Sequence, residues 1–273
     1  MDQPAKLQIA KPKKSLGQNF LIDTRIRHRI TDAADLSPSD TVVEIGPGRG
    51  FLTRSLSKFA GRLVAVELDE SLATSLRDKL DGCANITVIT ADAREIDINT
   101  LVEPKSTYKV VANLPYYAAT PIIRRFLEAS NKPSLMVVMV QREVAQEMAA
   151  APGKMRLLSV ATQLYGAPKI ITYVPAKAFR PAPRVTSAVV RIDVYRDIQL
   201  PIDSEKTFLD LVRSGFSAPR KQLKNSLALG LELTPTEIAE KLSAASIDPS
   251  RRAQTLSLSE WSRLHKSFNI HHC

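Results

Sequence analysis

The amino-acid sequence predicts an α/β protein with an open parallel sheet, helices on both faces of that sheet, and a small all-helical C-terminal domain. Short runs of Val, Ile and Leu alternate with segments of helical spacing up to about residue 194, which is typical of a parallel sheet with crossover helices. After that point only helical segments punctuated by prolines follow. The length of 273 residues suits one large and one small domain. We expect an N-terminal arm and the sheet domain in residues 1–198, and the helical domain in residues 199–273.

The expected elements follow from composition and spacing. The strands lack polar alternation, as strands buried on both faces do. They are expected at Thr41–Gly46, Leu63–Leu68, Ile86–Ala91, Val110–Leu114, Leu135–Gln141, Ile170–Val174 and Ser187–Val194. Helices are expected at Phe51–Phe59, Glu70–Leu80, Thr120–Ala129 and Arg142–Ala149, and in the second domain at Phe208–Phe216, Arg220–Leu229, Thr236–Ala244 and Ser259–Ser267.

Basic residues gather toward the two ends of the chain. The formal net charge of +10 divides into +5 in residues 1–30, zero in residues 31–175 and +5 in residues 176–273. Phosphate backbones attract basic flanks through counterion release, so we expect a nucleic acid partner; a basic solvated surface is the alternative. The densest clusters are Lys11–Lys14, Arg220–Lys224 and Arg251–Arg252.

Several classes of protein are excluded. The longest apolar stretches, such as Leu135–Val140, are far shorter than the roughly 20 residues needed to span a bilayer. The segment Met1–Lys14 has no apolar core of a secretory signal. Cys83 and Cys273 are the only cysteines, which argues against a disulfide scaffold. We expect a soluble cytoplasmic protein with no membrane partner.

A strand that runs into three glycines indicates a ligand site. The run Val42–Ile45 leads into Gly46, Gly48 and Gly50, and a helix follows. Glycines allow close backbone approach, and ligands of open α/β sheets bind at the carboxyl ends of the strands. A dinucleotide site favours G-x-G-x-x-G, and the acid Glu44 is a poor neighbour for phosphate. S-adenosylmethionine, with its zwitterionic tail and cationic sulfonium, fits better. A purely structural turn remains the alternative for the loop alone.

Acids end the next two strands. Glu67 lies 21 positions after Gly46, the offset at which a carboxylate accepts both ribose hydroxyls of a nucleoside. Asp92 ends the third strand and is placed to accept from an adenine amino group. Each acid alone is also explained as a helix cap, Asp92 especially. The three strand ends together are more specific than any one of them.

The fourth strand ends in a motif that packing does not explain. Asn113 is followed by Leu114, Pro115 and Tyr116, and proline makes the chain leave the sheet abruptly. The amide oxygen of Asn113 and the backbone carbonyl of Leu114 are suited to accept the two hydrogens of an adenine amino group. That arrangement aims the nitrogen lone pair at a methyl group and stabilises the positive charge that develops.

Two aromatic residues are candidates to hold the base. Aromatics make up only 5% of the chain, so their position beside a motif is informative. We expect Tyr116 to stack on an extruded base, with Phe179 from the Pro-rich loop on its other face. The alternative is that both are core aromatics.

The motifs in combination resemble a known family. The segment Lys14–Leu21, the loop Glu44–Gly50, Asn113–Tyr116 and Phe179–Pro183 resemble the KsgA (RsmA) family of small-subunit rRNA adenine dimethyltransferases, over nearly the whole chain. The resemblance implies a Rossmann-like class I methyltransferase fold, a helical RNA-binding domain, and N6,N6-dimethylation of two adjacent adenosines in the 3′-terminal hairpin of small-subunit rRNA.

The resemblance also implies the partners and the site. S-adenosylmethionine is the expected cofactor, S-adenosylhomocysteine its product, and an immature 30S-type subunit the expected partner of a monomer; no metal is expected. Gln18 is expected near the methionine tail. The expected catalytic residues are Asn113, Leu114, Tyr116 and Phe179, and the expected cofactor-binding residues are Gln18, Asn19, Leu21, Glu44, Gly46, Gly48, Glu67, Leu68, Asp92, Ala93 and Asn113.

Three other functions stay open at this stage. The same chemistry on DNA adenine or on large-subunit rRNA uses related loops, although the N-terminal Gln18–Phe20 segment and the basic helical tail favour RNA. An RNA-binding assembly factor in which methylation is secondary or lost belongs to another class; the intact Glu67, Asp92 and Asn113 argue that activity remains, and a checkpoint role is compatible with it. A nicotinamide oxidoreductase is the most distant option.

Overall fold

The computed structural model describes Lys13 and residues 17–269. The expected basic cluster Lys11–Lys14 and the expected absence of a signal segment therefore lie outside the described residues, apart from Lys13. The chain divides into two compact units, residues 1–142 with 170–191 and residues 143–169 with 192–273. The second unit thus contains residues 143–169 and 192–198 in addition to the expected helical domain, residues 199–273.

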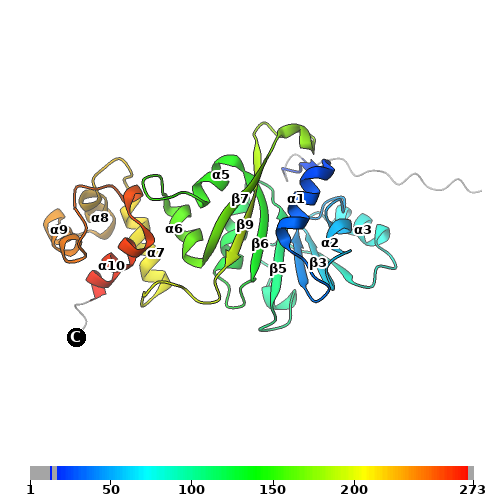
Figure 1. The fold of residues 1–273 in the computed structure, drawn as a ribbon, viewed down its shortest axis with the longest axis horizontal. Helices are drawn as coiled ribbons and strands as arrows, with labels where there is room; N and C mark the ends of the chain where they lie inside the picture. The colour runs from blue at the N-terminus through cyan, green and yellow to red at the C-terminus, as the bar shows by residue number, and fades with distance from the viewer. Residues whose placement is uncertain (1–12, 14–16, 270–273) are drawn as a thin grey trace, which may run out of the picture. The chain divides into compact units, whose positions relative to one another are not determined.

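A seven-stranded sheet forms the centre of the fold. Its strands lie in the order β4 (Ile86–Thr90), β3 (Arg62–Glu67), β2 (Thr41–Ile45), β5 (Tyr108–Asn113), β6 (Leu135–Gln141), β9 (Ser187–Val194) and β7 (Gly166–Val174), and Figure 1 shows β5, β6, β9 and β7 together. All seven expected strands are present, and β7 begins four residues earlier than expected.

The strand order reverses beside β2. On one side, β2 pairs in parallel with β3, and β3 pairs in parallel with β4. On the other side, β2 pairs in parallel with β5, and β5 pairs in parallel with β6. The register sets Ile45 beside both Val66 and Ala112. The carboxyl ends of β2, β3 and β5 therefore meet at one edge, at the switch point where ligands of such sheets bind.

Helices connect these strands. Those of the sheet region are α1 (Thr24–Ala34), α2 (Thr53–Leu56), α3 (Glu70–Lys79), α4 (Ala119–Leu127), α5 (Arg142–Met148) and α6 (Leu157–Tyr165). Right-handed crossovers toward opposite sheet edges put α3 and α4 on opposite faces. α2 is shorter than the expected helix Phe51–Phe59, and neither α1 nor α6 was expected.

The unexpected helix α1 belongs to the core. Its residues Ile26 and Ile30 are buried and pack in one cluster with Val42, Leu56 and Val111. The N-cap of the helix is Asp23, whose side chain accepts from the Arg25 N–H. The charged residues between its apolar positions conceal the periodicity.

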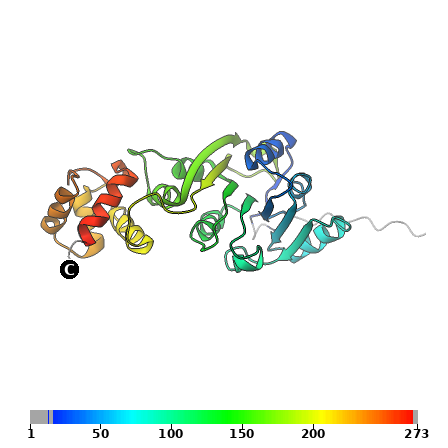
Figure 2. The same ribbon diagram turned by 60° about the horizontal axis from the view of Figure 1, so that its bottom comes forward.

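Between Glu205 and Asn269 the regular elements of the described chain are all helices, coloured yellow to red in Figure 2. They are α7 (Glu205–Gly215), α8 (Leu223–Leu231), α9 (Pro235–Ala244) and α10 (Leu258–Asn269). Thr234 and Glu237 form a capping box at the start of α9. Trp261 and Phe208 are fully buried.

No helix in the described part of the chain has the length and apolar character needed to cross a bilayer.

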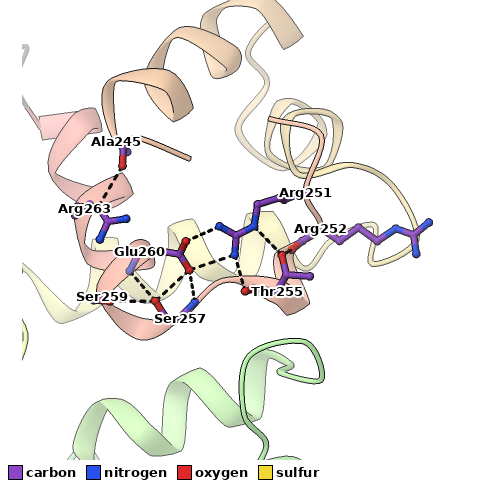
Figure 3. Close-up of polar contacts among 8 residues, drawn as sticks. All are labelled: Ala245, Arg251, Arg252, Thr255, Ser257, Ser259, Glu260 and Arg263. Atoms are coloured by element: carbon purple, nitrogen blue, oxygen red, sulfur yellow. Dashed lines mark hydrogen bonds and ion pairs between the residues drawn. The ribbon is translucent and has the colours of Figure 1, made fainter. Parts of the chain in front are cut away.

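An arginine clamp joins the segments before α10 (Figure 3). Arg251 pairs with both carboxylate oxygens of Glu260, and donates through Nε to Thr255 Oγ1 at 3.1 Å and through Nη2 to the Thr255 carbonyl at 2.6 Å. The Arg251 carbonyl accepts from Leu223 N, at the start of α8. The clamp holds the starts of α8 and α10 together, whereas the neighbouring Arg252 is exposed and points away from it.

We predict a pH-dependent loss of stability for Glu260→Gln. The Arg251 guanidinium lowers the pKa of Glu260 from 4.5 to about 2, so the stabilisation is complete above pH 4.5 and is lost as the pH falls toward 2. The free energy of unfolding should fall by about 1–3 kcal/mol at pH 7. Urea unfolding should show the two proteins converging below pH 4. Arg252→Gln is the matched control, and an equal loss in that variant would contradict the clamp.

Candidate active site

One cavity of about 530 Å³ lies at the carboxyl ends of the central strands. It is lined by the glycine loop after β2, the ends of β3, β4 and β5, the segment 17–22 and Phe179. All fourteen residues that the sequence nominated line this cavity. The roles of the individual residues stay predictions.

A small second sheet brings the N-terminal segment to the cavity. β1 (Phe20–Leu21) pairs antiparallel with β8 (Phe179–Arg180), and Leu21 lies opposite Phe179. The Ile22 N–H donates to the Ala178 carbonyl at 2.8 Å. Two residues are too few for a strand pattern, so this sheet was not expected. It closes the cavity with a part of the chain distant in sequence.

The glycine loop has the backbone conformation that only glycine adopts readily. Gly46, Gly48 and Gly50 have φ of 70°, 57° and 78°. A Cβ on Gly46 would lie 3.2 Å from the Asn113 carbonyl oxygen, and one on Gly48 would lie 3.0 Å from the Phe20 ring. The loop therefore packs closely against both the end of β5 and the N-terminal segment.

Glu44 is a buried acid with an unsatisfied atom. It is 1% exposed, and its Oε2 has no hydrogen-bond partner among the described residues. Burial raises the pKa of Glu44 to about 8; the Thr53 hydroxyl opposes the rise and the Glu67 charge adds to it. A cationic group in the cavity would satisfy this oxygen.

Glu67 is held by the backbone. Its Oε2 accepts from Gly48 N at 2.9 Å and its Oε1 from Asp69 N at 3.0 Å. Burial raises the pKa of Glu67, and these two N–H groups oppose the rise. Each oxygen keeps a further lone pair, so the carboxylate is fixed in direction and still able to accept two hydroxyls.

Asp92 is paired with Arg94. Its Oδ1 accepts from Arg94 N at 2.8 Å, and the guanidinium lies 2.5 Å from Oδ2. The Arg94 side chain holds the pKa of Asp92 below its ordinary value. The same guanidinium lies 5.9 Å from the centre of the half-exposed Tyr117 ring. Arg94 thus occupies both oxygens of the carboxylate that is expected to bind adenine. The sequence analysis did not identify this contact.

The side-chain amide of Asn113 is oriented by the N-terminal segment. Its Nδ2 donates to the Asn19 carbonyl at 3.3 Å. The Leu114 N–H donates to the Met139 carbonyl at 3.3 Å, which anchors the chain as it leaves the sheet. With its nitrogen engaged, Asn113 presents its oxygen as the acceptor.

The two aromatic candidates differ in surroundings. Tyr116 is half-buried and its hydroxyl lies 2.7 Å from Ser187 Oγ at the start of β9; burial raises the pKa of the phenol, and Ser187 opposes the rise. Phe179 is 4% exposed and belongs to the hydrophobic core as well as to the cavity wall. Phe179 therefore packs in the core and also stays a candidate to hold the base from the cavity wall.

Sequence reasoning missed Asp69. It lies two residues after Glu67, and its side chain binds Lys13 Nζ at 2.9 Å and Gln18 Nε2 at 3.1 Å. The motif Glu67-Leu68-Asp69 was the available signal, but an acid before a helix is explained by capping alone, and Asp69 is indeed the N-cap of α3.

Comparisons with known proteins agree on one family. The model of the ribosomal RNA adenine dimethylase family matches residues 9–269. The ribosomal RNA small subunit methyltransferase A of Dehalococcoides mccartyi is 44% identical over 252 residues, 92% of this chain and 87% of the relative. The protein of the same name from Pelotomaculum thermopropionicum is 44% identical over 269 residues, 94% and 91% of the two chains.

Solved structures confirm the predicted fold. The crystal structure of the 23S rRNA methyltransferase ErmE matches with a TM-score of 0.73 and 27% identity, covering 92% of this chain and 100% of that one. A dimethyladenosine transferase from Plasmodium falciparum matches with a TM-score of 0.78 and 22% identity, covering 92% and 97%. The second likeness bears on the fold alone.

We predict that Glu44→Gln stabilises the cofactor-free protein at alkaline pH. Because the folded pKa of about 8 exceeds the ordinary 4.5, ionisation of Glu44 costs stability as the pH rises from 4.5 through 8. At pH 8.5 the free energy of unfolding of the variant should exceed that of the wild type by roughly 1–3 kcal/mol, which raises its unfolding temperature by several degrees. At pH 5 the two proteins should unfold at the same temperature. Glu240→Gln on the exposed face of α9 is the control. Parallel curves for wild type and Glu44→Gln would contradict this assignment.

Proposed function

This chain belongs to the ribosomal RNA adenine dimethylase family, whose methyl donor is S-adenosylmethionine, and on that premise we propose that its substrate is small-subunit rRNA. The proposed reaction converts two adjacent adenosines of the 3′-terminal hairpin into N6,N6-dimethyladenosine during small-subunit assembly. The observation that carries the proposal is the single cavity into which the glycine loop, the three acids, Asn113 and Tyr116 all open.

The residues of the cavity fit the cofactor. Glu44 has a buried oxygen without a partner and suits the amino group of the methionine tail. Glu67 is fixed toward the ribose, and Asp92 suits the adenine amino group once Arg94 releases it. The glycine backbone leaves room for close approach. Bound S-adenosylmethionine supplies a methyl group on a sulfonium, which is electrophilic without a metal.

Asn113 and Leu114 position the nucleophile. The adenine N6 lone pair is delocalised into the ring, so the amino group must be turned before it attacks. The Asn113 Oδ1 and the Leu114 carbonyl accept its two hydrogens, and their dipoles stabilise the positive charge that develops on nitrogen. The proton is lost readily after methylation, so no strong base is needed.

Tyr116 and Phe179 hold the base. The bond between the Tyr116 hydroxyl and Ser187 fixes the tilt of the ring. Stacking contributes roughly 1–3 kcal/mol per base, which offsets the cost of extruding the adenosine from its hairpin. The arginines and lysines of both flanks supply attraction to phosphate.

The small subunit is favoured over the large one. Curated relatives 44% identical over nearly the whole chain carry a small-subunit name, whereas the structure named for 23S rRNA is 27% identical. We also propose action on an immature 30S-type particle, a monomeric state and a cytoplasmic location.

The substrate proposal is tested with labelled methyl donor. Immature small subunits, naked small-subunit rRNA, large-subunit rRNA and duplex DNA are offered in parallel. Mass analysis should find dimethyladenosine at two adjacent positions of small-subunit rRNA. Methylation of large-subunit rRNA or DNA alone would overturn the substrate and leave the chemistry standing.

We predict that Asn113→Ala removes turnover and spares binding. Loss of one preorganised acceptor of this kind typically costs about 10²–10³ in kcat. The dissociation constant for S-adenosylmethionine, measured by calorimetry, should change by no more than about threefold, since Asn113 is one of eleven residues expected to bind the cofactor but one of only two acceptors for the base. Asn99→Ala, at an exposed position outside the cavity, is the matched control. Equal turnover in Asn113→Ala and wild type would remove Asn113 from the mechanism.

A further inference from the structure

The carboxylate of Asp69 holds the N-terminal segment. Its side chain is 1% exposed and accepts from Lys13 Nζ at 2.9 Å and from Gln18 Nε2 at 3.1 Å, while Ser71 donates through N at 3.1 Å and Oγ at 2.6 Å. Burial alone would raise the pKa of Asp69, but the bonds from Ser71, Lys13 and Gln18 outweigh it and set the pKa at about 2. The carboxylate is therefore ionised at neutral pH.

The contacts continue from Asp69 to the catalytic amide. Both polar atoms of the Gln18 side-chain amide are hydrogen-bonded, because its Nε2 donates to Asp69 and its Oε1 accepts from Lys13 N at 2.8 Å. The next residue, Asn19, donates through Nδ2 to the Gly17 carbonyl at 3.0 Å, which stiffens the turn. The Asn19 carbonyl in turn accepts from Asn113 Nδ2 at 3.3 Å.

We propose that Asp69 is a positioning residue for catalysis, which acts through Gln18 and Asn19 to set the orientation of the Asn113 amide. The inference rests on the role proposed for Asn113. It assigns a second function to a residue otherwise explained by its cap on α3.

The orientation matters because an amide group has two unlike ends. The terminal torsion of asparagine is soft and roughly two-fold. An Asn113 released from the Asn19 carbonyl can turn its NH₂ group toward the adenine amino group, where two donors would face each other. Fixing the nitrogen on Asn19 removes that orientation before substrate binds, which is a gain from preorganisation.

Asp69 also connects the two halves of the cavity. Its own N–H donates to Glu67 Oε1, on the side that suits the ribose, while its carboxylate holds the segment that meets Asn113. Loss of the carboxylate is therefore expected to affect turnover at saturating cofactor as well as cofactor affinity.

The test compares substitutions that keep α3 capped. Asn is as good an N-cap as Asp, so Asp69→Asn preserves the helix start and removes the charge that holds Lys13. Lys13→Gln leaves the cap untouched, and because Lys13 is half-exposed its ion pair contributes little. Asp23→Asn, the same substitution at the N-cap of α1, is the matched control.

Single-turnover methylation of small-subunit rRNA at saturating cofactor is the measurement. We expect a fall of about tenfold for Asp69→Asn, about twofold for Lys13→Gln and none for Asp23→Asn, with unchanged unfolding temperatures. In an Asn113→Ala background Asp69→Asn should lower the residual rate less than twofold, because the group that it positions is gone.

The outcomes separate the inference from the proposed function. A wild-type rate for Asp69→Asn, or losses that multiply in the double variant, would overturn the role of Asp69. An inactive wild-type protein, or a fully active Asn113→Ala, would instead overturn the proposed function. If Asp69→Asn weakened cofactor binding but left the turnover at saturating cofactor unchanged, that result would also overturn the inference.

Discussion

The parallel pairing of β2 with β3 on one side and with β5 on the other is the constraint on which the site depends. This arrangement reverses the direction of the strand order at β2 and brings the ends of three strands to one edge. Glu44, Glu67 and Asn113 then line one cavity although they are distant in sequence. A shift of the β2–β5 register by one residue would turn Glu44 to the opposite face and abolish the cavity wall.

The same edge carries an energetic cost. Glu44 is buried beside Glu67, and one of its oxygens lacks a partner among the described residues. Burial of such groups disfavours the folded state in the absence of a ligand. The hydrophobic cluster of α1, α2 and the central strands offsets that cost. A cationic ligand group would pair with the Glu44 carboxylate and so offset the free energy that its burial costs in the empty site.

The sequence predicts those parts of the structure that depend on neighbouring residues better than those that depend on contacts between distant residues. Strands buried on both faces carry long apolar runs, and the glycines of the β2 loop are required by positive φ, so both were predictable. The sheet of β1 and β8 has two residues in each strand and was not. The helix α1 was concealed by its charged residues. The contact of Lys13 with Asp69 joins residues 56 positions apart and follows from tertiary proximity, which spacing along the chain does not encode.

The N-terminal segment is the least predictable part of the site and yet touches both of its halves. Gln18 meets the α3 cap beside Glu67, Asn19 meets Asn113, and Leu21 lies opposite Phe179. Each contact spans more than 50 residues of sequence, so closing it costs chain entropy that local structure does not recover. No single contact of this kind is strong, but together they give the segment one placement. A wall built from weak, dispersed contacts opens at lower cost than the sheet behind it, which suits a cavity that must admit a cofactor and then hold a base.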